Sequence, residues 1–372
     1  IYGIPKLIDA NFAGTVKSQE CTLILCEGDS AKAGIVSGLS KEDRNIMGVY
    51  PLRGKLMNVR DATISKINDN NEIKDIKKIM GLEANKKYKD TKTLRYGKIC
   101  FMTDQDLDGV HIKGLIINVF DSQWNDLIKI NHFLGFMNTP ILKARKKKKE
   151  VLFYNEKEYK EWKNENDMKG WNIKYYKGLG TSTSSEFKEY FKNRKIVDFI
   201  YDKKTSSDAL DKVFRKHRAS DRKKWLEKYD RNNALDTSKS SITYDEFVDK
   251  EMIHFSKYDC ERSIPNIMDG LKTSQRKILY CAFKRNLTNE IKVAQFGGYV
   301  SEHSGYHHGE TSLMQAIVGM AQDFLGSNNI NLLLPNGQFG TRMQGGADSA
   351  SERYIFTQLN PITRHLFPAS DD

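Results

Sequence analysis

Residues 98–109, KICFMTDQDLDG, join an apolar run to three carboxylates at alternating positions. The first five residues are apolar apart from the lysine and are bounded on both sides, which predicts a short, buried parallel strand. Residues 112–120 form an apolar segment that is long enough for a helix. Asp104, Asp106 and Asp108 therefore lie where a strand passes into a helix, and open α/β sheets bind ligands at that position.

A second strand-end carboxylate points to the same place. Residues 21–26, CTLILC, predict another buried strand, and Glu27 follows it directly. Gly28 makes the turn, and Asp29 or Ser30 can cap a helix that runs on to about residue 39. Carboxylates this close repel one another unless a cation lies among them, and their hard oxygen atoms suit Mg²⁺. We expect two strand-end acids of one parallel sheet to converge on one cation.

Two basic segments of the first half admit both a structural and a nucleic-acid interpretation. Residues 50–55, YPLRGK, place Arg53 and Lys55 beside Gly54, where the backbone can approach a ligand closely. A phosphate contact and a plain basic turn explain that segment equally well. The run KARKKKK at residues 143–149 is typical of an exposed hairpin tip or a disordered loop, with non-specific contact to a nucleic-acid backbone as the alternative.

Two familiar ligand loops are excluded by their spacing. Residues 175–182, YYKGLGTS, join aromatic residues to a glycine-rich turn with one lysine, but the Walker spacing is missing, so we exclude nucleotide binding there. The aspartates of residues 104–109 match the opening of an EF-hand loop. Its twelfth position is Leu115, where calcium binding needs a bidentate Glu, so we exclude this site as well.

The composition favours a polyanionic partner. The chain has 372 residues, enough for two or three domains, and 60 Lys and Arg against 48 Asp and Glu give a net charge of +12. Nucleic acid is the commonest such partner, although a lysine-rich solvated surface has the same composition. The five cysteines form no C-x-x-C pair, which favours a reducing compartment without disulfides or a zinc module. No apolar run approaches the length of a membrane span, about 20 residues. The first residue is Ile1, as expected for part of a longer protein.

The later part of the chain changes character at a polar segment. Residues 186–230 carry charges in an amphipathic helical pattern, and residues 232–241, NNALDTSKSS, predict a domain boundary. Beyond it we expect a helix over residues 247–255, a turn at 263–266 and a basic helix over 268–286. This order is consistent with a helix-turn-helix DNA reader. Isoleucines near helical spacing predict core positions in the first half at Ile64, Ile67, Ile73, Ile76 and Ile79.

Two segments near the end carry residues suited to phosphate chemistry. Residues 306–310, YHHGE, open a predicted helix over 311–325. Adjacent histidines on a helix point to different sides, so contact with a phosphate is a better functional interpretation than a shared metal. Residues 351–357, SERYIFT, predict a strand that leaves a glycine-rich wing. Arg353 precedes Tyr354 there, and the glycine-rich loops on either side could leave the tyrosine hydroxyl exposed.

These segments occur in the order found in the type IIA DNA topoisomerases, and the match covers nearly the whole chain. The resemblance rests on EGDSA (27–31), PLRGK (51–55), DQDLDG with HIKG (104–114), YYKGLGT (175–181), IPN to QRK (264–277), YHHGE (306–310), LLLPNG (332–337), FGTR (339–342) and ASERYI (350–355). The chain resembles eukaryotic topoisomerase II and its relatives in large DNA viruses more than the split bacterial gyrase subunits, because its metal half and tyrosine half are joined.

The resemblance implies an α/β plus α+β fold, with a Toprim domain (a parallel sheet flanked by helices) followed by a winged-helix (helix-turn-helix) domain. The implied organisation is a lead-in over residues 1–19, a Toprim metal-binding domain over 20–150, a largely helical Toprim extension over 151–231, a linker over 232–245 and the winged-helix domain over 246–372. The chain would start after an ATPase and transducer region and stop before the rest of the tower and the exit gate.

The resemblance also implies a metal site. Glu27, Asp104 and Asp106 would hold Mg²⁺, with Asp108 nearby. Leu107 stands where a His is common in the family, so this position is not expected to be essential. Mn²⁺ or Ca²⁺ could substitute for Mg²⁺, and ATP would act only through a domain absent from this chain.

A tyrosine site and a DNA path follow from the same resemblance. Tyr354 would be the nucleophile that forms a 5′-phosphotyrosyl bond, and Arg353 would contact the scissile phosphate. Arg276 and His308 would support the phosphate and the bound strand. Further DNA contacts are expected from Arg53, Lys55, Lys177, Lys272, Lys277 and His307.

The function implied is the DNA gate of a type IIA topoisomerase. It would cleave both strands reversibly with Mg²⁺, serving ATP-driven strand passage, relaxation and decatenation in the full-length, ATP-hydrolysing enzyme. The expected partners are double-stranded DNA and a second copy of the chain, whose tyrosine would meet the first copy's metal site, and no membrane. The expected location is the nucleus for a cellular protein, or the host cytoplasm, viral factory or virion for a viral one.

Two alternatives stay open. A Toprim nuclease or primase would use the same acids, but a primase would be expected to carry a zinc module, and neither activity explains Arg353 and Tyr354. A non-catalytic DNA-binding protein would bind without metal and would tolerate loss of Glu27.

Overall fold

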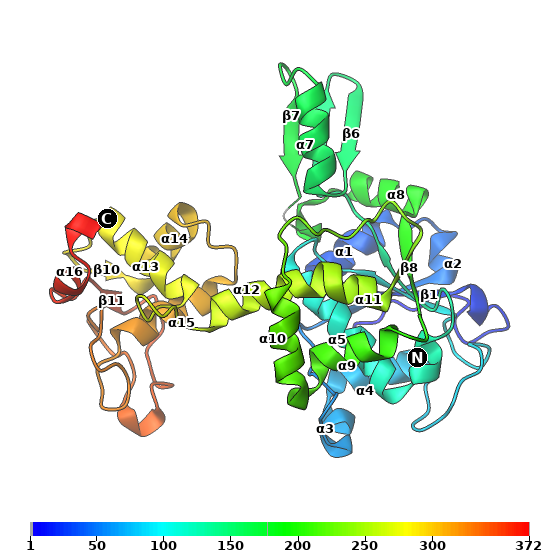
Figure 1. The fold of residues 1–372 in the computed structure, drawn as a ribbon, viewed down its shortest axis with the longest axis horizontal. Coiled ribbons are helices and arrows are strands. Elements are labelled where there is room, and N and C mark those ends of the chain that lie inside the picture. Colours follow the sequence, from blue (N-terminus) through cyan, green and yellow to red (C-terminus); the bar gives the residue numbers. More distant parts are fainter. Residues whose placement is uncertain (1–2, 177, 372) are drawn as a thin grey trace. The chain divides into compact units, whose positions relative to one another are not determined.

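The computed structural model describes residues 3–176 and 178–371 and divides into two compact units (Figure 1). The first unit extends to Lys257, and the second begins at Tyr258. Lys177, an expected DNA contact, lies outside the described residues.

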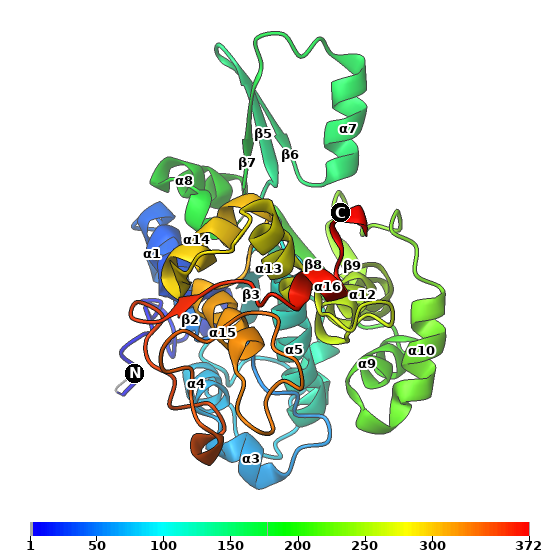
Figure 2. The ribbon, with the colours of Figure 1, turned by 90° about the vertical axis from the view of Figure 1, so that its left-hand side faces the viewer.

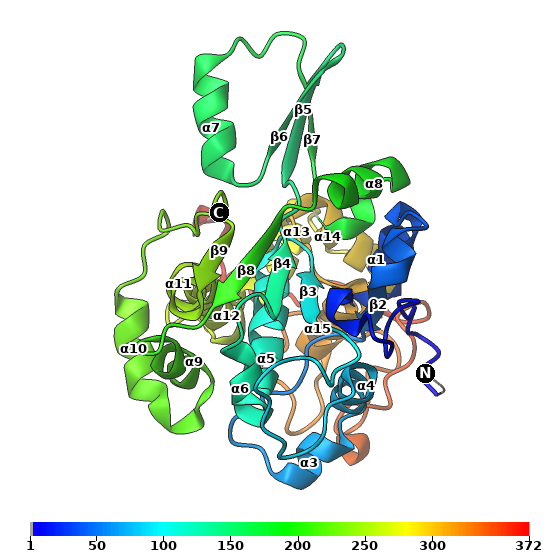
Figure 3. The same ribbon diagram turned by 90° about the vertical axis from the view of Figure 1, so that its right-hand side faces the viewer.

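The first unit is built on a six-stranded sheet with the strand order β2-β1-β3-β4-β8-β9 (Figure 3). Its strands are β1 (Thr22–Glu27), β2 (Met47–Leu52), β3 (Lys98–Met102), β4 (Leu134–Met137), β8 (Ile196–Ile200) and β9 (Ser241–Thr243). β1 pairs in parallel with β2 and β3, and β3 with β4, as the apolar runs predict. The sheet is not wholly parallel, however, because β8 runs antiparallel to β4. The first residue of β8, Ile196, pairs with the last residue of β4, Met137, so the chain re-enters the sheet at the edge where it left.

The two faces of this sheet are covered by different helices. Leu23 and Leu25 pack in the core shared with α4 (Asn71–Met80) and α5 (Leu107–Gln123), whereas Ile24 and Cys26 pack in the core shared with α1 and α8. Alternate residues of a strand point to opposite faces, so an apolar run such as residues 21–26 must be covered on both. The helices α1 and α8 span Gly28–Gly38 and Ser184–Asn193, and further helices are α2 (Asp43–Ile46), α3 (Ile64–Asp69), α6 (Asn125–Ile128), α9 (Ser206–Phe214) and α10 (Ala219–Glu227).

The isoleucines that were expected in the core are buried with one exception. Ile67, Ile73, Ile76 and Ile79 are buried, but Ile64 is 76% exposed. The reason is that the helical spacing is interrupted. Ile64 begins the short helix α3, which ends at Asp69, and α4 starts a separate helix at Asn71 with its own cap, the side chain of Asn70.

A small three-stranded sheet projects from the first unit, with α7 (Glu156–Glu165) against it (Figures 1 and 3). Its strands are β5 (Leu142–Lys146), β6 (Lys149–Phe153) and β7 (Asn172–Tyr175). β5 and β6 form an antiparallel hairpin in which Lys146 pairs with Lys149. The basic run over 143–149 is therefore a hairpin tip, as predicted, and not a disordered loop.

The segment expected to link two domains, residues 232–245, is part of the first unit. β9 lies within it and pairs in parallel with β8, and Tyr244 is fully buried. The chain continues through α11 (Tyr244–Phe247), a π-helical turn (Val248–Met252) and α12 (Ile253–Ser263) before the division at residue 258. The polar composition of this segment reflects its exposed turns, while its few apolar residues complete the sheet. The expected helical extension over 151–231 likewise contributes β8 to that sheet.

The second unit packs three helices against a short antiparallel sheet (Figure 2). Its elements are α13 (Thr273–Lys284), β10 (Ile291–Lys292), α14 (Val293–His303), α15 (Glu310–Ala321), β11 (Phe356–Thr357) and α16 (Thr363–Leu366). The basic helix expected from residue 268 starts only at Thr273, because Gly270 has a φ of +69° and Asp269 accepts a hydrogen bond from the Leu271 amide. The strand expected over 351–357 is confined to β11, and residues 352–354 form a turn. Across the described residues, no helix is long and apolar enough to cross a membrane.

Candidate functional site

Four carboxylates gather at the carboxyl edge of the main sheet. Cys26 and Met102 are partners in the parallel register of β1 and β3, so the ends of these strands are adjacent. Glu27 is the last residue of β1, and Asp104 follows β3 by two residues. The sequence predicts this convergence, and the mutual influence of these acids on their pKa values bears it out.

Protein donors hold the aspartates of this cluster. Asp104 Oδ1 accepts a hydrogen bond of 2.7 Å from the Leu179 amide. Asp106 caps α5, since its Oδ1 accepts a hydrogen bond of 2.7 Å from the Gly109 amide. Asp108 Oδ1 lies 2.5 Å from Lys55 Nζ in an ion pair.

Burial and mutual repulsion perturb two of the acids. Burial raises the pKa of Glu27 to about 7, and the charges of Asp104, Asp106 and Asp108 add to this rise, while Lys55 opposes it. Burial also raises the pKa of Asp104, with a contribution from Asp106, although the Leu179 amide favours its charged form. A bound cation would relieve both effects, because it stabilises the charged carboxylates.

The donor set fits a hard divalent cation that keeps several water ligands. Within residues 3–176 and 178–371, no three His, Cys, Asp or Glu side chains already form a group that could hold a metal ion. The reason is that each aspartate of the cluster is engaged by a protein donor. Mg²⁺ commonly uses only one or two carboxylates together with water, so this cluster suits it better than a metal that demands a closed protein cage.

A cavity of about 240 Å³ lies beside the acids, lined in part by Asp104, Asp106 and Lys113. Lys113 is only 5% exposed, and its Nζ lies 3.5 Å from Glu251 Oε2 and 4.6 Å from the centre of the Phe136 ring. The sequence analysis missed this buried cation, because HIKG was interpreted only as the start of an apolar helix. Its side chain adds positive charge behind the carboxylate cluster.

The tyrosine site lies in the second unit, on a turn with a buried anchor. Tyr354 is 76% exposed, and Arg353 is exposed beside it. Ile355 is 1% exposed, and its carbonyl accepts a hydrogen bond of 3.0 Å from the Val293 amide. The Glu352 carbonyl accepts a hydrogen bond of 3.1 Å from the Ala294 amide. The turn is therefore fixed on both sides to the start of α14, while the phenol points away from the core.

The two adjacent histidines share one hydrogen-bonding partner. The Tyr258 hydroxyl lies 3.3 Å from His307 Nε2 and also hydrogen-bonds His308 Nε2. The expectation that they point to different sides of a helix is wrong, because α15 begins only at Glu310 and the histidine rings lie 4.3 Å apart in the loop before it. The sequence gives no periodic signal for Tyr258, because its contact with the histidines depends on the fold.

Basic side chains expected to contact DNA gather around these histidines. A cavity of about 330 Å³ in the second unit is lined by Tyr258, Arg262, Lys272, Lys277, His307 and His308, among others. Lys277 Nζ donates to the Gly305 carbonyl at 3.2 Å. The structure thus brings together four predicted contacts, namely Lys272, Lys277, His307 and His308.

The remaining predicted contacts are engaged elsewhere. Arg276 forms a two-point ion pair with Asp269, with both nitrogen–oxygen distances at 2.7 Å, and is not among the residues that line the histidine cavity. Arg53 is exposed, and its Nε lies 3.8 Å from Glu72 Oε1. The sequence analysis missed Asp269 as the partner of Arg276.

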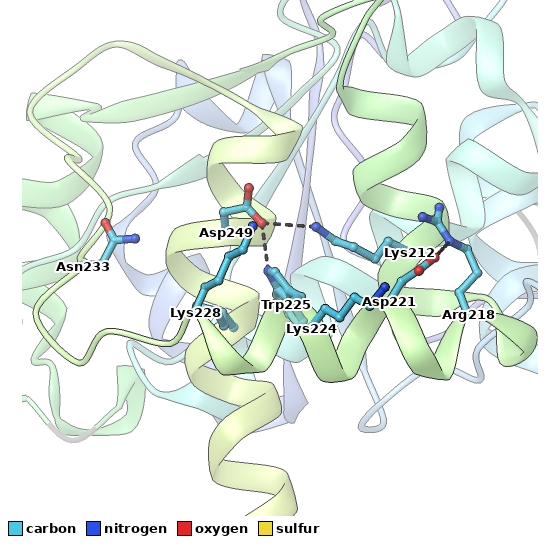
Figure 4. Close-up of a pocket in the computed structure, with 9 residues that line it drawn as sticks. Lys212, Arg218, Asp221, Lys224, Trp225, Lys228, Asn233 and Asp249 are labelled. Carbon is cyan, nitrogen blue, oxygen red and sulfur yellow. Dashed lines mark hydrogen bonds and ion pairs between the residues drawn. The ribbon is translucent and has the colours of Figure 1, made fainter.

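A separate pocket of about 430 Å³ lies between α9, α10 and the π-helical turn (Figure 4). Lys212 Nζ lies 3.5 Å from Asp249 Oδ1, and Trp225 Nε1 donates to the same oxygen at 2.8 Å. Arg218 Nε pairs with Asp221 at 2.7 Å. No residue singled out in the sequence lines this pocket, and three of its charged groups already have partners there.

Comparison with protein families gives three consecutive matches along the chain. Residues 22–135 match the Toprim domain, and residues 137–260 match the C-terminal associated domain of Toprim. Residues 262–372 match the DNA gyrase/topoisomerase IV family, in the part that the gyrase protein without the Toprim domain carries. The last two matches meet near the division between the two compact units.

Individual relatives match over nearly all of the chain. It is 54% identical to DNA topoisomerase 2 of Plasmodium falciparum, covering 100% of this chain and 27% of the relative. It is also 54% identical to that of Arabidopsis thaliana, covering 99% and 26%, and 51% identical to that of Saccharomyces cerevisiae, covering 100% and 26%. Among solved structures, the DNA-binding, cleavage and re-ligation domain of Plasmodium falciparum topoisomerase II has a TM-score of 0.84 and 53% identity, covering 100% of this chain and 51% of that one.

The chain spans about a quarter of the length of these full-length relatives. The family matches together cover nearly all of its residues, in the same order as the two compact units. The fold, the order of the matches and the identity to these relatives agree, and the chain belongs to the type II DNA topoisomerase family.

Proposed function

We propose that this chain forms the DNA gate of a type IIA topoisomerase, which cleaves and reseals both strands of duplex DNA through a phosphotyrosine bond. The observation that carries the proposal is the exposed Tyr354–Arg353 pair on a turn held by the buried Ile355. The carboxylate cluster at the sheet edge supplies the second element that such a reaction needs. A nuclease without a tyrosine nucleophile leaves this anchored, exposed turn unexplained.

In this proposal, the hydroxyl oxygen of Tyr354 attacks the phosphorus of a backbone phosphate. A bond forms between the tyrosine oxygen and the 5′ phosphate, the bond from phosphorus to the 3′ oxygen breaks, and the 3′ oxygen takes up a proton. Arg353 stabilises the charge that develops on the phosphate oxygens, since a guanidinium can bind phosphate through two hydrogen bonds. Because the ester bond is conserved, attack by the 3′ hydroxyl reverses the reaction and restores both the DNA and the tyrosine.

The carboxylates hold the metal in this proposal. Glu27, Asp104 and Asp106 bind Mg²⁺, with Asp108 beside them, and Mn²⁺ or Ca²⁺ can substitute. When bound, the ion stabilises negative charge on phosphate and on the leaving oxygen. Asp108 contributes indirectly, because its ion pair fixes Lys55 at the edge of the cluster.

The histidine cavity binds the DNA backbone in this proposal. His308 and His307, aligned by Tyr258, together with Lys272 and Lys277, contact phosphates of the bound strand. Arg276 joins them after exchanging Asp269 for a phosphate, and Lys55, Arg53 and Lys177 extend the path on the first unit.

The working assembly is a homodimer, in which the tyrosine of one copy acts with the metal site of the other. ATP hydrolysis, strand passage, relaxation and decatenation belong to the full-length enzyme, through an ATPase domain outside this chain. The location that follows is the nucleus in a cell, or the viral factory, host cytoplasm or virion for a viral protein.

A trapping assay tests this function. The chain is incubated with supercoiled plasmid and Mg²⁺ or Ca²⁺, quenched with detergent and digested with protease. We expect nicked and linear DNA that require the metal, and that disappear with Glu27→Gln. Breaks that persist in Glu27→Gln would contradict the proposed metal site, and the absence of breaks from the chain extended at both ends would contradict the proposed cleavage.

A further inference from the structure

The tip of the β5–β6 hairpin concentrates positive charge that no acid in the described chain neutralises. Lys143 and Arg145, on β5, both lie close to Glu150, at 2.7 Å and 3.5 Å. Lys147, Lys148 and Lys149 are exposed, and the described residues offer them no ion-pair partner. The tip therefore presents three adjacent cations on a turn, while the strands leading to it are locally neutralised.

The hairpin rises from the edge of the sheet that carries the acids. β4 runs parallel to β3, so its end at Met137 lies at the same edge as Asp104, and β5 follows five residues later. β7 returns the chain to this edge, where the Leu179 amide holds Asp104. A strand rises about 3.3 Å per residue, so the five residues of β5 carry the tip about 17 Å from its base.

This length corresponds to a few base pairs of duplex. Successive phosphates along one strand are spaced by about 3.4 Å of helix axis, so about 17 Å spans roughly five base pairs. A duplex that reaches the carboxylate cluster and continues past it can therefore meet the tip without the hairpin bending.

The hairpin is stiff enough to hold such a contact. Phe153, Tyr159, Trp162 and Trp171 pack between α7 and the sheet, with ring centres 4.9–5.3 Å apart for three of their pairs. Lys146 Nζ lies 5.9 Å from the centre of the Trp171 ring, which ties the base of the tip to this cluster. A rigid mount keeps the entropy cost of binding low.

The turn itself places a lysine where the backbone disfavours one. Lys147 has a φ of +56°, in the left-handed region that glycine and asparagine adopt more readily. A strained backbone residue at an exposed tip favours a functional reason for its side chain.

We propose that Lys147, Lys148 and Lys149 bind the phosphate backbone of duplex DNA that extends beyond the cleaved segment. The inference rests on the proposed function and adds to it a second DNA contact, remote from both the acids and the tyrosine. The tip offers cations but no apolar side chain, and its backbone is already paired in the hairpin, so a phosphate backbone fits it better than a peptide strand does.

The test compares binding to a long and a short duplex. The tip variant is Lys147→Asn, Lys148→Ser and Lys149→Thr, in which asparagine suits the positive φ and threonine suits a strand. The control variant, Lys87→Ser, Lys89→Ser and Lys92→Ser, removes the same charge from exposed positions just before β3, at the opposite edge of the sheet. Affinities for duplexes of about 20 and about 60 base pairs are measured from about 50 to 200 mM salt, where phosphate contacts dominate the salt dependence.

We expect the tip variant to lose affinity for the long duplex about tenfold at low salt, and its salt slope to fall by about two to three, since each lost phosphate contact removes about 0.9. The control variant and the short duplex should show neither change. Equal slopes for tip variant and wild type on the long duplex would overturn the inference.

Cleavage of the short duplex, followed in the same samples, separates the two proposals. Cleavage by wild-type protein together with equal salt slopes would leave the proposed function standing and remove the tip contact. A reduced slope without any cleavage would support the tip contact while contradicting the proposed function. Circular dichroism of both variants reports whether the small sheet has kept its fold.

Discussion

The amide nitrogen of Leu179 donates a hydrogen bond of 2.7 Å to Oδ1 of Asp104, across 75 residues of sequence. Asp104 follows the central strand β3, whereas Leu179 follows the projecting sheet that the chain builds after β4. The glycine-rich segment over 175–182 therefore serves a carboxylate rather than a nucleotide phosphate. Its turn fixes the side chain that the proposed metal site depends on.

Gly178 makes this contact possible, and its replacement should disturb the site. A Cβ atom at this position would lie 2.5 Å from Asp104 Oδ2 and 2.8 Å from Asp104 Cγ. The backbone of Gly178 is extended, so the difficulty comes from this contact and not from backbone strain. We expect Gly178→Ala to reduce metal-dependent DNA cleavage at least tenfold at low Mg²⁺, with partial recovery at high Mg²⁺, because Asp104 must move. The cost in stability should be about 1–3 kcal/mol.

Gly180→Ala is the matched control, since a Cβ there meets nothing within 4 Å. Its cleavage activity and unfolding midpoint should equal those of the wild type. Equal loss of cleavage in both variants would show that the loop, rather than its contact with Asp104, is what matters.

The raised pKa of Glu27 makes the metal-free protein sensitive to pH. The folded-state pKa is about 7 against an ordinary value of 4.5, so the folded state holds this proton more tightly than the unfolded state does. In the absence of metal, this carboxyl therefore stabilises the fold as pH falls from about 7 towards about 4.5, and that stabilisation is lost as pH rises through 7.

We expect Glu27→Gln to unfold at a higher temperature than the wild type at about pH 8 in EDTA, and to show a flatter dependence between about pH 5 and 8. Thermal unfolding over this range measures both, with Glu42→Gln, at an exposed position before α2, as the control. A Glu27→Gln variant that is less stable than the wild type at about pH 8 would mean that Glu27 makes a favourable contact in its charged form.

Tyr258 should act on DNA cleavage through the histidines. Its hydroxyl hydrogen-bonds Nε2 of both His307 and His308, so Tyr258→Phe removes their shared partner and leaves the ring in place. We expect a three- to tenfold loss of cleavage and a change in the pH profile of cleavage between about pH 5 and 8, where histidines titrate.

Tyr280→Phe serves as the control, because Tyr280 is a half-exposed tyrosine on α13 that does not line the histidine cavity. Thermal unfolding of both variants should match the wild type within a few degrees. Loss of cleavage without any change in the pH profile would contradict a role through the imidazoles and indicate a packing effect alone.

The sequence predicted those parts of the molecule that depend on local pattern. The apolar runs ending at Cys26 and Met102 became adjacent parallel strands, and this alone brings Glu27 to the aspartates. The turn signals flanking 143–149 predicted the hairpin. These features follow from strand burial and turn chemistry, which act over a few residues.

Other parts depended on contacts between distant residues and could not be found in this way. The segment over 232–245 looks polar and short, yet Ile242 and Tyr244 complete the core of the first unit. The turn over residues 352–354 has the composition of a strand, but the hydrogen bond from the Ala294 amide to the Glu352 carbonyl bends the chain there. The partners of Asp104 and Arg276, namely Leu179 and Asp269, carry no signal of their own in the sequence.

The most direct test of the account identifies the atom that becomes joined to DNA. The chain is trapped with a duplex oligonucleotide labelled at one end, in the presence of Ca²⁺, digested with trypsin and nuclease, and analysed by mass spectrometry. Tyr354→Phe is run beside Tyr175→Phe, an exposed tyrosine of the first unit.

We predict a nucleotide bound through its 5′ phosphate to the peptide that contains Tyr354, present in wild type and Tyr175→Phe and missing in Tyr354→Phe. The fold of Tyr354→Phe should be unchanged, since the side chain is 76% exposed. An adduct on another residue, or DNA breaks that persist in Tyr354→Phe, would contradict the assignment of Tyr354 as the nucleophile.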